Sequence, residues 1–177
     1  MKTSIITRII DTPAGKMILG SYEDKLCLCD WVESQRRDSS DYRIQRFLKS
    51  TFTEGSSPVI EQTIVQLDEY FASKRKIFDI PLLFTGTEFQ CRVWNELLRI
   101  PYGTTISYSE QASRIGRPTA LRAVASANGS NPISIIVPCH RVVGKTNKLV
   151  GYAGGLGIKE FLLNLENGNC SRKLLSV

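Results

Sequence analysis

Histidine is nearly absent from this chain, and long apolar runs are missing altogether. His140 is the sole histidine among 177 residues, which excludes any metal site that needs two imidazole ligands. No stretch approaches the ~18 consecutive apolar residues of a membrane-spanning helix. The N-terminus also lacks the apolar core and cleavage site of a secretory signal. We therefore expect a cytoplasmic protein without membrane contact.

Cysteine is too sparse and too scattered for a disulfide framework. The five cysteines are an odd number spread over the chain, so reduced thiols are expected. Cys27 and Cys29 would share one face of a strand, where they suit a core as small apolar side chains. They lack the second ligand pair that a structural zinc site requires. We expect no metal and no cofactor.

Acidic residues are scarce in the second half of the chain. Residues 1–80 carry 12 Lys and Arg against 12 Asp and Glu, whereas residues 81–177 carry 11 against five. The whole net charge of +6 therefore lies in the second half. This asymmetry predicts a polyanionic partner for that half. Otherwise the composition is that of a globular protein, with 42% hydrophobic and 23% charged residues.

The first part of the chain predicts strands followed by helices. Three apolar, β-branched segments are separated by turn residues and predict strands: 5–10, 16–22 and 26–32. A helix is indicated over 41–49, and Pro58 favours the start of another. Apolar residues then recur at helical spacing as far as Phe71. Residues 78–83 predict a last short strand or a linker.

The second part predicts mainly helices. A capping-box pattern at 87–90 opens an amphipathic helix, and a second at 107–110 opens a short one. Pro118 begins a third helix, which ends in a left-handed cap at 128–129. The two short helices joined by a tight turn are a helix-turn-helix candidate, and an ordinary helical hairpin is the alternative.

The last of these helices predicts an outer face with one long side chain. At about 100° per residue, the apolar positions fall on the inner side: Ala120, Leu121, Ala123, Val124 and Ala127. Arg122 projects from the opposite side, beside Thr119, Ala125 and Ser126. Such a face can approach a grooved surface closely. It favours a nucleic-acid groove, with a protein contact as the alternative.

The chemistry is concentrated in one segment. A β-like apolar run over 133–137 ends at Pro138, and Cys139 and His140 follow at once. A thiolate is a nucleophile, and a nearby base or cation raises its population. Because adjacent side chains do not face each other, a relay through one water is easier to build than a direct pair. A distant acid would then orient His140. A cysteine peptidase is disfavoured, since it needs a remote histidine.

Taken in order, the motifs resemble the O6-alkylguanine-DNA alkyltransferases, also called methylated-DNA–protein-cysteine methyltransferases. The pentapeptide Pro138-Cys139-His140-Arg141-Val142 is similar to the active-site motif of that family. The resemblance continues on both sides: Phe89-Gln90-x-x-Val93-Trp94, Ile100-Pro101-x-Gly103, Ser107-Tyr108, Arg122-Ala123-Val124, Asn131-Pro132, Gly151-Tyr152-Ala153-Gly154-Gly155 and Leu162-Leu163-x-x-Glu166. The Thr12-Pro13-x-Gly15 opening resembles the N-terminal domain of the family.

The resemblance implies an α/β fold of two domains. Residues 1–84 would form a ribonuclease H-like sheet-and-helix domain without catalysis of its own. Residues 85–177 would form a mostly helical, winged-helix-like domain that holds a helix-turn-helix and the site. The implied function is suicide DNA repair, in which an alkyl group passes from O6-alkylguanine, or from O4-alkylthymine, in a flipped-out base. The partner would be double-stranded DNA, bound through its minor groove by a monomer.

The resemblance also implies roles for single residues. Cys139 would accept the alkyl group, His140 would hold a water that takes the thiol proton, and Glu166 would orient the imidazole. Asn131 would brace the active-site loop, and Tyr108 would donate a hydrogen bond to the lesion base.

The same resemblance implies the contacts to base and DNA. Tyr152 would cover the flipped base, and backbone groups of Val142 and Ala153 would read its edges. Arg122 would fill the hole that the base leaves. Further DNA contacts would come from these residues: Thr119, Ala123, Ala125, Ser126 and Arg141. Many relatives have glycine where this chain has Ala125 and Ser126, which are still small.

Two rival functions stay open. A lesion-sensing module would bind alkylguanine without transferring the group, and a cysteine-dependent hydrolase would turn over acyl substrates. Covalent transfer to Cys139 separates the first rival from repair, and multiple turnover separates the second.

Overall fold

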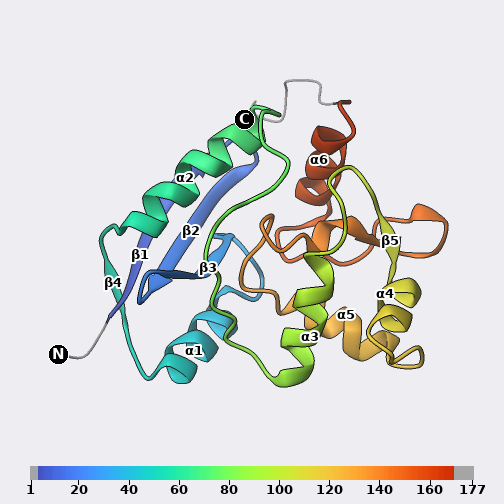
Figure 1. The fold of residues 1–177 in the computed structure, drawn as a ribbon, viewed down its shortest axis with the longest axis horizontal. Coiled ribbons are helices and arrows are strands. Elements are labelled where there is room, and N and C mark those ends of the chain that lie inside the picture. The colour runs from blue at the N-terminus through green and yellow to red at the C-terminus, as the bar shows by residue number, and fades with distance from the viewer. Residues whose placement is uncertain (1–3, 170–177) are drawn as a thin grey trace.

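A four-stranded sheet forms the N-terminal part of the computed structural model, which describes residues 4–169 (Figure 1). Its strands are β1 (Ile5–Thr12), β2 (Gly15–Tyr22), β3 (Lys25–Trp31) and β4 (Phe52–Glu54). The order is β3-β2-β1-β4, with β4 parallel to β1 and the other pairs antiparallel. The tight β1–β2 turn needs Gly15, whose φ is +135°. The three strands predicted from the sequence are confirmed.

Two helices accompany this sheet. Helix α2 (Pro58–Phe71) lies against it and begins as predicted, because the Ser57 hydroxyl caps the amide of Ile60 at 3.3 Å. Helix α1 (Arg37–Leu48) starts four residues earlier than predicted. Its polar first turn carries no apolar signal and is held by the Arg37–Asp41 ion pair.

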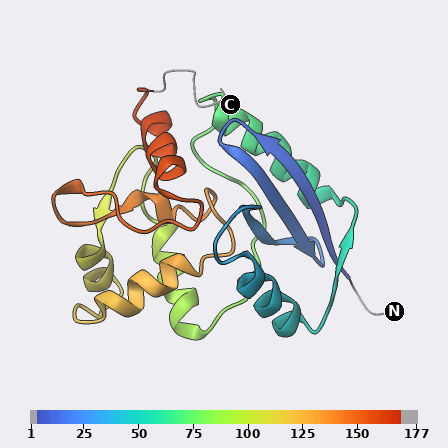
Figure 2. The ribbon, with the colours of Figure 1, turned by 180° about the vertical axis from the view of Figure 1, so that it is seen from behind.

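Short helices dominate the C-terminal part. They are α3 (Glu88–Leu97), α4 (Tyr108–Arg114), α5 (Leu121–Gly129) and α6 (Leu156–Glu166), with 3₁₀ turns at Cys139–Arg141 and Lys145–Asn147. Strands β5 (Ile106–Ser107) and β6 (Val142–Val143) pair in parallel. Seen from behind, the two parts lie side by side, and the connection from α2 to α3 runs between them (Figure 2). Among residues 4–169, no helix could span a membrane.

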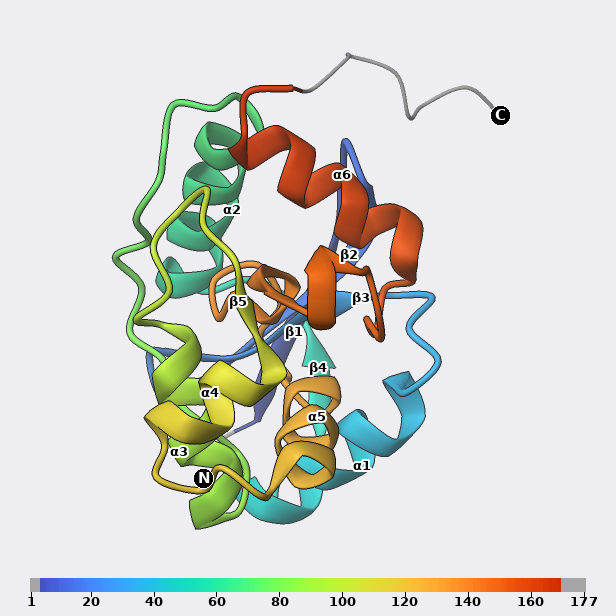
Figure 3. The same ribbon diagram turned by 90° about the vertical axis from the view of Figure 1, so that its right-hand side faces the viewer.

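Helices α4 and α5 lie side by side (Figure 3). A buried amide pair between Gln111 and Asn128, with bonds of 3.0 and 2.7 Å, joins them. The indole of Trp94 on α3 donates to the Ala127 carbonyl at 2.8 Å. These contacts fix which face of α5 is buried.

Three expectations about α5 are wrong. The helix begins at Leu121, so Pro118 lies in the preceding turn, and it ends without a left-handed cap, since Ser130 has φ −97°. Leu121 is 42% exposed and Ala123 is also exposed, whereas Val124 and Ala127 face inward. The reason is that the anchors on α3 and α4 decide which face of a nine-residue helix is buried.

Cys27 and Cys29 are buried but do not share a face of β3. A β-bulge opposite Gly20 and Ser21 shifts the register there. Cys29 consequently packs into the main core, whereas Cys27 packs into a small cluster with Ile44 and its neighbours. Burial raises the pKa of both thiols. Cys170 lies outside the described residues.

The main core draws side chains from both parts of the chain. Trp31 and Leu67 from the sheet part are buried with Trp94 and Leu162 from the helical part. The boundary between the two parts is therefore a packed apolar interface, and the candidate site lies against it.

Candidate active site

The segment from Asn131 to Pro138 is a set of tight turns, not the strand predicted over 133–137. Every residue of the segment is buried. The Asn131 side chain replaces part of a strand ladder: its amide donates to the Val137 carbonyl at 2.8 Å, and its oxygen accepts from the Ile133 amide at 3.0 Å. A strand is disfavoured because the two prolines that bracket the run cannot donate backbone hydrogen bonds.

Ile135 stands at the centre of these turns with φ +70°. A β-branched residue in this left-handed region is strained, at a cost of about 1–3 kcal/mol. Its side chain is only 1% exposed. Packing of Ile135 into the core therefore offsets the strain and holds the segment in one conformation.

Cys139 follows this segment at the start of a 3₁₀ turn and is 8% exposed. Burial raises the pKa of its thiol to about 11, although the Asn131 hydrogen bond and the charge of Lys159 act in the opposite direction. The Asn131 amide nitrogen lies 3.3 Å from the sulfur. The thiol is thus protonated at neutral pH and needs a base before it can react as a nucleophile.

A buried histidine–carboxylate pair lies behind the cysteine. His140 Nε2 is 2.8 Å from Glu166 Oε1 at the end of α6. Because an ionised carboxylate can only accept, Nε2 must carry the proton. Nδ1 then keeps its lone pair, and it has no hydrogen-bond partner within residues 4–169. Burial lowers the pKa of His140, so the imidazole is neutral and able to take a proton.

The Glu166 carboxylate accepts hydrogen bonds from several parts of the chain. Besides His140, its carboxylate accepts from Arg141 Nε and Nη2, both at 2.9 Å, from the Tyr70 hydroxyl at 2.8 Å and from the Gly103 amide at 3.0 Å. Burial alone would raise the pKa of Glu166. The hydrogen bonds and charges of His140 and Arg141 outweigh it and lower the pKa well below the ordinary value.

Arg141 does not occupy the DNA-contacting position expected from the sequence. It is 6% exposed, and its guanidinium binds Glu166 and donates to the Ile100 carbonyl at 2.7 Å. A buried guanidinium with these partners cannot reach a phosphate. Its role is to hold the Glu166 carboxylate.

Lys159 is a site residue that the sequence reasoning missed. It is fully buried on α6, and its ammonium donates to the carbonyls of Val142 and Val150 at 2.7 and 2.8 Å. Burial lowers its pKa to about 8. A lysine within the apolar stripe of a helix was the signal that could have revealed it. Val142, whose backbone was expected to read the base, is fully buried, and its carbonyl accepts from Lys159.

A pocket of about 510 Å³ opens onto Cys139. Tyr108, Tyr152 and Ala153 line it together with Arg122. The Tyr108 hydroxyl donates to the Val150 carbonyl at 3.3 Å, and burial raises the pKa of Tyr108 to about 12, so the phenol stays protonated. The structure thus brings the predicted base-binding side chains together around the thiol.

The predicted DNA-contacting residues on and before α5 lie on the surface. All five are exposed: Thr119, Arg122, Ala123, Ala125 and Ser126. Arg122 and Ala125 also line the pocket, so this surface adjoins the pocket directly.

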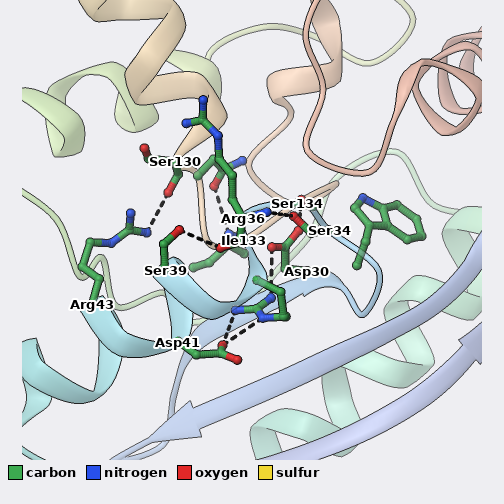
Figure 4. Close-up of polar contacts among 12 residues, drawn as sticks. Asp30, Ser34, Arg36, Ser39, Asp41, Arg43, Ser130, Ile133 and Ser134 are labelled. Atoms are coloured by element: carbon green, nitrogen blue, oxygen red, sulfur yellow. Dashed lines mark hydrogen bonds and ion pairs between the residues drawn. The ribbon is translucent and has the colours of Figure 1, made fainter.

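The N-terminal part contacts the segment before Cys139 at the end of β3, where Asp30 lies beside Ser134 (Figure 4). The Ser134 amide donates to the Cys29 carbonyl at 2.6 Å, and the Ser134 hydroxyl donates to Asp30 at 3.0 Å. Asp30 in turn binds Arg37 at 3.0 Å. One residue further on, the Trp31 indole donates to the Tyr152 hydroxyl at 3.2 Å. Strand β3 thus holds both the turns before Cys139 and the loop that covers the pocket.

No cluster of three or more His, Cys, Asp or Glu side chains suited to a metal is found within residues 4–169. The site is built from a thiol, an imidazole–carboxylate pair and hydroxyl and amide donors. This set suits nucleophilic attack by the Cys139 sulfur on a substrate, with proton transfer from the thiol to His140.

Two families match consecutive parts of the chain. Residues 5–84 match the ribonuclease-like domain of 6-O-methylguanine DNA methyltransferase, and residues 88–168 match its DNA binding domain. The chain belongs to the 6-O-methylguanine DNA methyltransferase family. The α/β architecture expected from the resemblance, with a sheet part followed by a helical part, is confirmed.

Relatives within this family match almost the whole chain. The methylated-DNA–protein-cysteine methyltransferase of Methanosarcina acetivorans is 45% identical over 163 residues, which are 92% of this chain and 97% of the relative. The constitutive enzyme of Bacillus subtilis is 40% identical over 163 residues, covering 88% and 92%. Mycobacterium tuberculosis OGT in complex with DNA superposes with a TM-score of 0.80 at 43% identity, covering 93% of this chain and 94% of the other.

Proposed function

We propose that this protein repairs DNA by moving an alkyl group from the O6 atom of guanine to the sulfur of Cys139. The observation that carries the proposal is a thiol at the wall of a pocket large enough for a purine base, together with a buried His140–Glu166 pair. Family membership supports the same reaction, because the relatives described above are methylated-DNA–protein-cysteine methyltransferases.

The bond changes balance without a cofactor. The thiolate attacks the alkyl carbon, an S–C bond forms, and the C–O6 bond breaks with its electron pair going to guanine. A proton from the Tyr108 hydroxyl, or from water, neutralises the leaving base. The thioether has no route back to a thiol at this site, so each molecule reacts once.

Proton removal from Cys139 falls to His140. Its free Nδ1 can take the thiol proton through one water, while Nε2 remains bonded to Glu166. Glu166 stabilises the imidazolium that forms. Because burial raises the pKa of the thiol to about 11, the thiolate forms only as the reaction proceeds. This arrangement also limits oxidation of Cys139 before it meets a lesion.

The pocket suits an extruded purine. Tyr108 can donate to the base, Tyr152 can cover its face, and the backbone of Ala153 can read its edges. A planar base inside the pocket would place its O6 substituent against Cys139. Alkylguanine in duplex DNA is therefore the substrate we propose, with alkylthymine as a second.

The surface of α5 is the proposed DNA contact. Apart from Arg122 and Leu121, its exposed residues are small: Ala123, Ala125 and Ser126. Such a helix can enter the minor groove, with Arg122 filling the space of the extruded base. The net charge of +6 in residues 81–177 favours phosphate contacts, so binding should weaken with salt. All site residues come from one chain, so a monomer suffices. The need for a reduced Cys139 also favours the cytoplasm as the location.

The decisive experiment is intact-protein and peptide mass spectrometry after mixing with duplex DNA that contains one O6-methylguanine. We expect one S–CH₃ in place of S–H at Cys139 and no second turnover. The Cys139→Ala variant should bind the DNA without being modified. Cys91→Ala is the matched control, since Cys91 is also a free, partly accessible thiol outside the pocket, and it should react like wild type.

Each contrary result has a distinct meaning. Binding without modification of the wild-type protein would favour a lesion sensor. Repeated turnover on acyl esters would favour a hydrolase. Methylation at another residue would overturn the assignment of Cys139 as the acceptor.

A further inference from the structure

Among residues 4–169, Tyr70 is the one donor to Glu166 that comes from the sheet part of the molecule. It lies near the end of α2, 96 positions before the carboxylate in the sequence, and its side chain is fully buried. Its hydroxyl donates to Glu166 Oε1 at 2.8 Å. The same oxygen accepts from His140 Nε2, also at 2.8 Å.

We propose that Tyr70 is a positioning residue for alkyl transfer, whose hydroxyl holds Glu166 and weakens it as a partner of His140. The inference rests on the proposed function, because it assigns a role in deprotonating Cys139. It gives the sheet part a share in the chemistry, whereas the sequence predicted a domain without catalysis of its own.

Three donors compete for one oxygen of Glu166. A carboxylate oxygen has two lone pairs, but Oε1 accepts from Tyr70, His140 and Arg141 Nη2. Each donor withdraws charge that would otherwise stabilise the imidazolium. With the tyrosine in place, His140 remains neutral and able to accept a proton. Without it, Oε1 would bind the protonated imidazole more strongly, and the pKa of His140 would rise.

The phenol is suited to this role. Burial, followed by the nearby Glu166 charge, raises the pKa of Tyr70 well above its ordinary value, so the hydroxyl remains a donor over the working pH range. The other groups that face Glu166 are the guanidinium of Arg141 and the Gly103 amide. Tyr102 lies nearby without donating to the carboxylate, and Lys76 lies over its ring.

The ring of Tyr70 has a separate, structural role. It packs edge-on against Phe71 and Tyr102, with ring centroids 5.4 and 6.1 Å away. Replacing tyrosine by phenylalanine keeps these contacts and removes only the hydroxyl. Tyr102→Phe is a matched control, because it removes a hydroxyl from the same aromatic cluster without touching the carboxylate.

The first test is a pH titration of the imidazole resonance by NMR. Since His140 is the sole histidine, tag-free protein gives one imidazole signal without assignment. In Tyr70→Phe we expect the titration midpoint to rise by about half a pH unit, a shift that part of one ordinary hydrogen bond can supply. Tyr102→Phe should titrate like wild type. An unchanged or lower midpoint in Tyr70→Phe would overturn the proposal.

The second test is the pH–rate profile for reaction with free O6-benzylguanine, which bypasses DNA binding. The acid limb of Tyr70→Phe should move to higher pH by the same amount, with the plateau rate within about threefold of wild type. A purely structural role would lower the rate equally at every pH. If wild type fails to react at all, the proposed function fails, whereas the NMR shift still decides the role of Tyr70.

If the Tyr70→Phe variant does not fold, a tyrosine analogue at the same position allows the same titration to be measured. A 3-fluorotyrosine placed at position 70 retains the shape and is a stronger donor. The His140 midpoint should then fall below that of wild type. A midpoint equal to that of wild type would contradict the inference.

Discussion

The two parts of the molecule differ in what they contribute to the site. The helical part supplies the nucleophile Cys139, the imidazole–carboxylate pair and the exposed face of α5, and it carries the whole net positive charge. The sheet part has no net charge over residues 1–80, yet Asp30, Trp31 and Tyr70 from this part all bond to site residues.

This difference shows that sequence motifs identify the reactive residues of a site more readily than the residues that hold them in place. Reactive groups need particular residue types at short spacings, and these stand out in a sequence. Residues that hold them need only the right position in space. The sheet part is therefore more than a scaffold beside the site, because it forms one side of it.

The largest effect is expected from Glu166→Gln, which removes the carboxylate that the helical part supplies. Loss of the carboxylate should slow transfer by about 100-fold, because His140 loses the charge that stabilises its protonated form. The buried Arg141 also loses its counter-charge, so the variant should be less stable at pH 7 by about 3 kcal/mol. Single-turnover kinetics and urea denaturation measure the two losses. An unchanged pH–rate profile would remove Glu166 from the relay.

The same variant gives a pH signature of stability. The pKa of Glu166 in the folded protein lies below its unfolded value of about 4.3, so its stabilisation is complete above that pH. It is lost as the pH falls from there toward the folded-state pKa. The difference in the free energy of unfolding between wild type and Glu166→Gln should consequently become smaller as the pH is lowered. If the difference in unfolding free energy did not change with pH, the ionised Glu166 carboxylate would not be the source of the stabilisation.

The next effect concerns the DNA face of the helical part. Arg122→Ala should slow repair of duplex DNA by about tenfold, because extruding a base costs a few kcal/mol that the arginine helps to offset. The reaction with free O6-benzylguanine should not change, since no base is extruded. Stopped-flow comparison of both substrates tests this. An equal loss of transfer rate with duplex DNA and with free O6-benzylguanine would refute the proposal that Arg122 fills the space of the extruded base.

A smaller effect is expected where the two parts meet. Ser134→Ala removes the donor to Asp30 in a site that excludes water, and it should destabilise the protein by about 1–2 kcal/mol. Transfer should slow only a few-fold, because the Cys29–Ser134 backbone bond remains. Ser39→Ala, an exposed serine on α1, is the control and should match wild type. If both variants melt alike, the Ser134–Asp30 contact does not hold the site.

Much of the fold could be predicted where local signals agree. Turn residues separated the strands β1 to β3, and Pro58 with its Ser57 cap marked the start of α2. The run over 133–137 failed because its apolar pattern fits both a strand and buried turns. What decides between them is the Asn131 side chain, which satisfies the backbone groups of the turns.

The site residues that lie within sequence motifs could be predicted, whereas those outside the motifs were missed. The sequence identified Cys139 and His140 by their proximity, and Lys159 could have been found as a charge on an apolar stripe. Tyr70 could not, because an apolar-faced helix gives no sign that one hydroxyl meets a carboxylate 96 positions away. The prediction that Arg141 contacts DNA was wrong because its side chain is buried, and the sequence motif does not show whether a charged side chain is exposed.

The pairing of Ser134 with Cys29 also bears on how the protein is made. During synthesis, N-terminal segments generally fold first, so β3 can be in place when the Cys139 segment leaves the ribosome. Glu166 emerges later still, and only then does His140 gain its acceptor. A protein that reacts once gains from this order, because its thiol acquires a working base only after the α6 segment has been made.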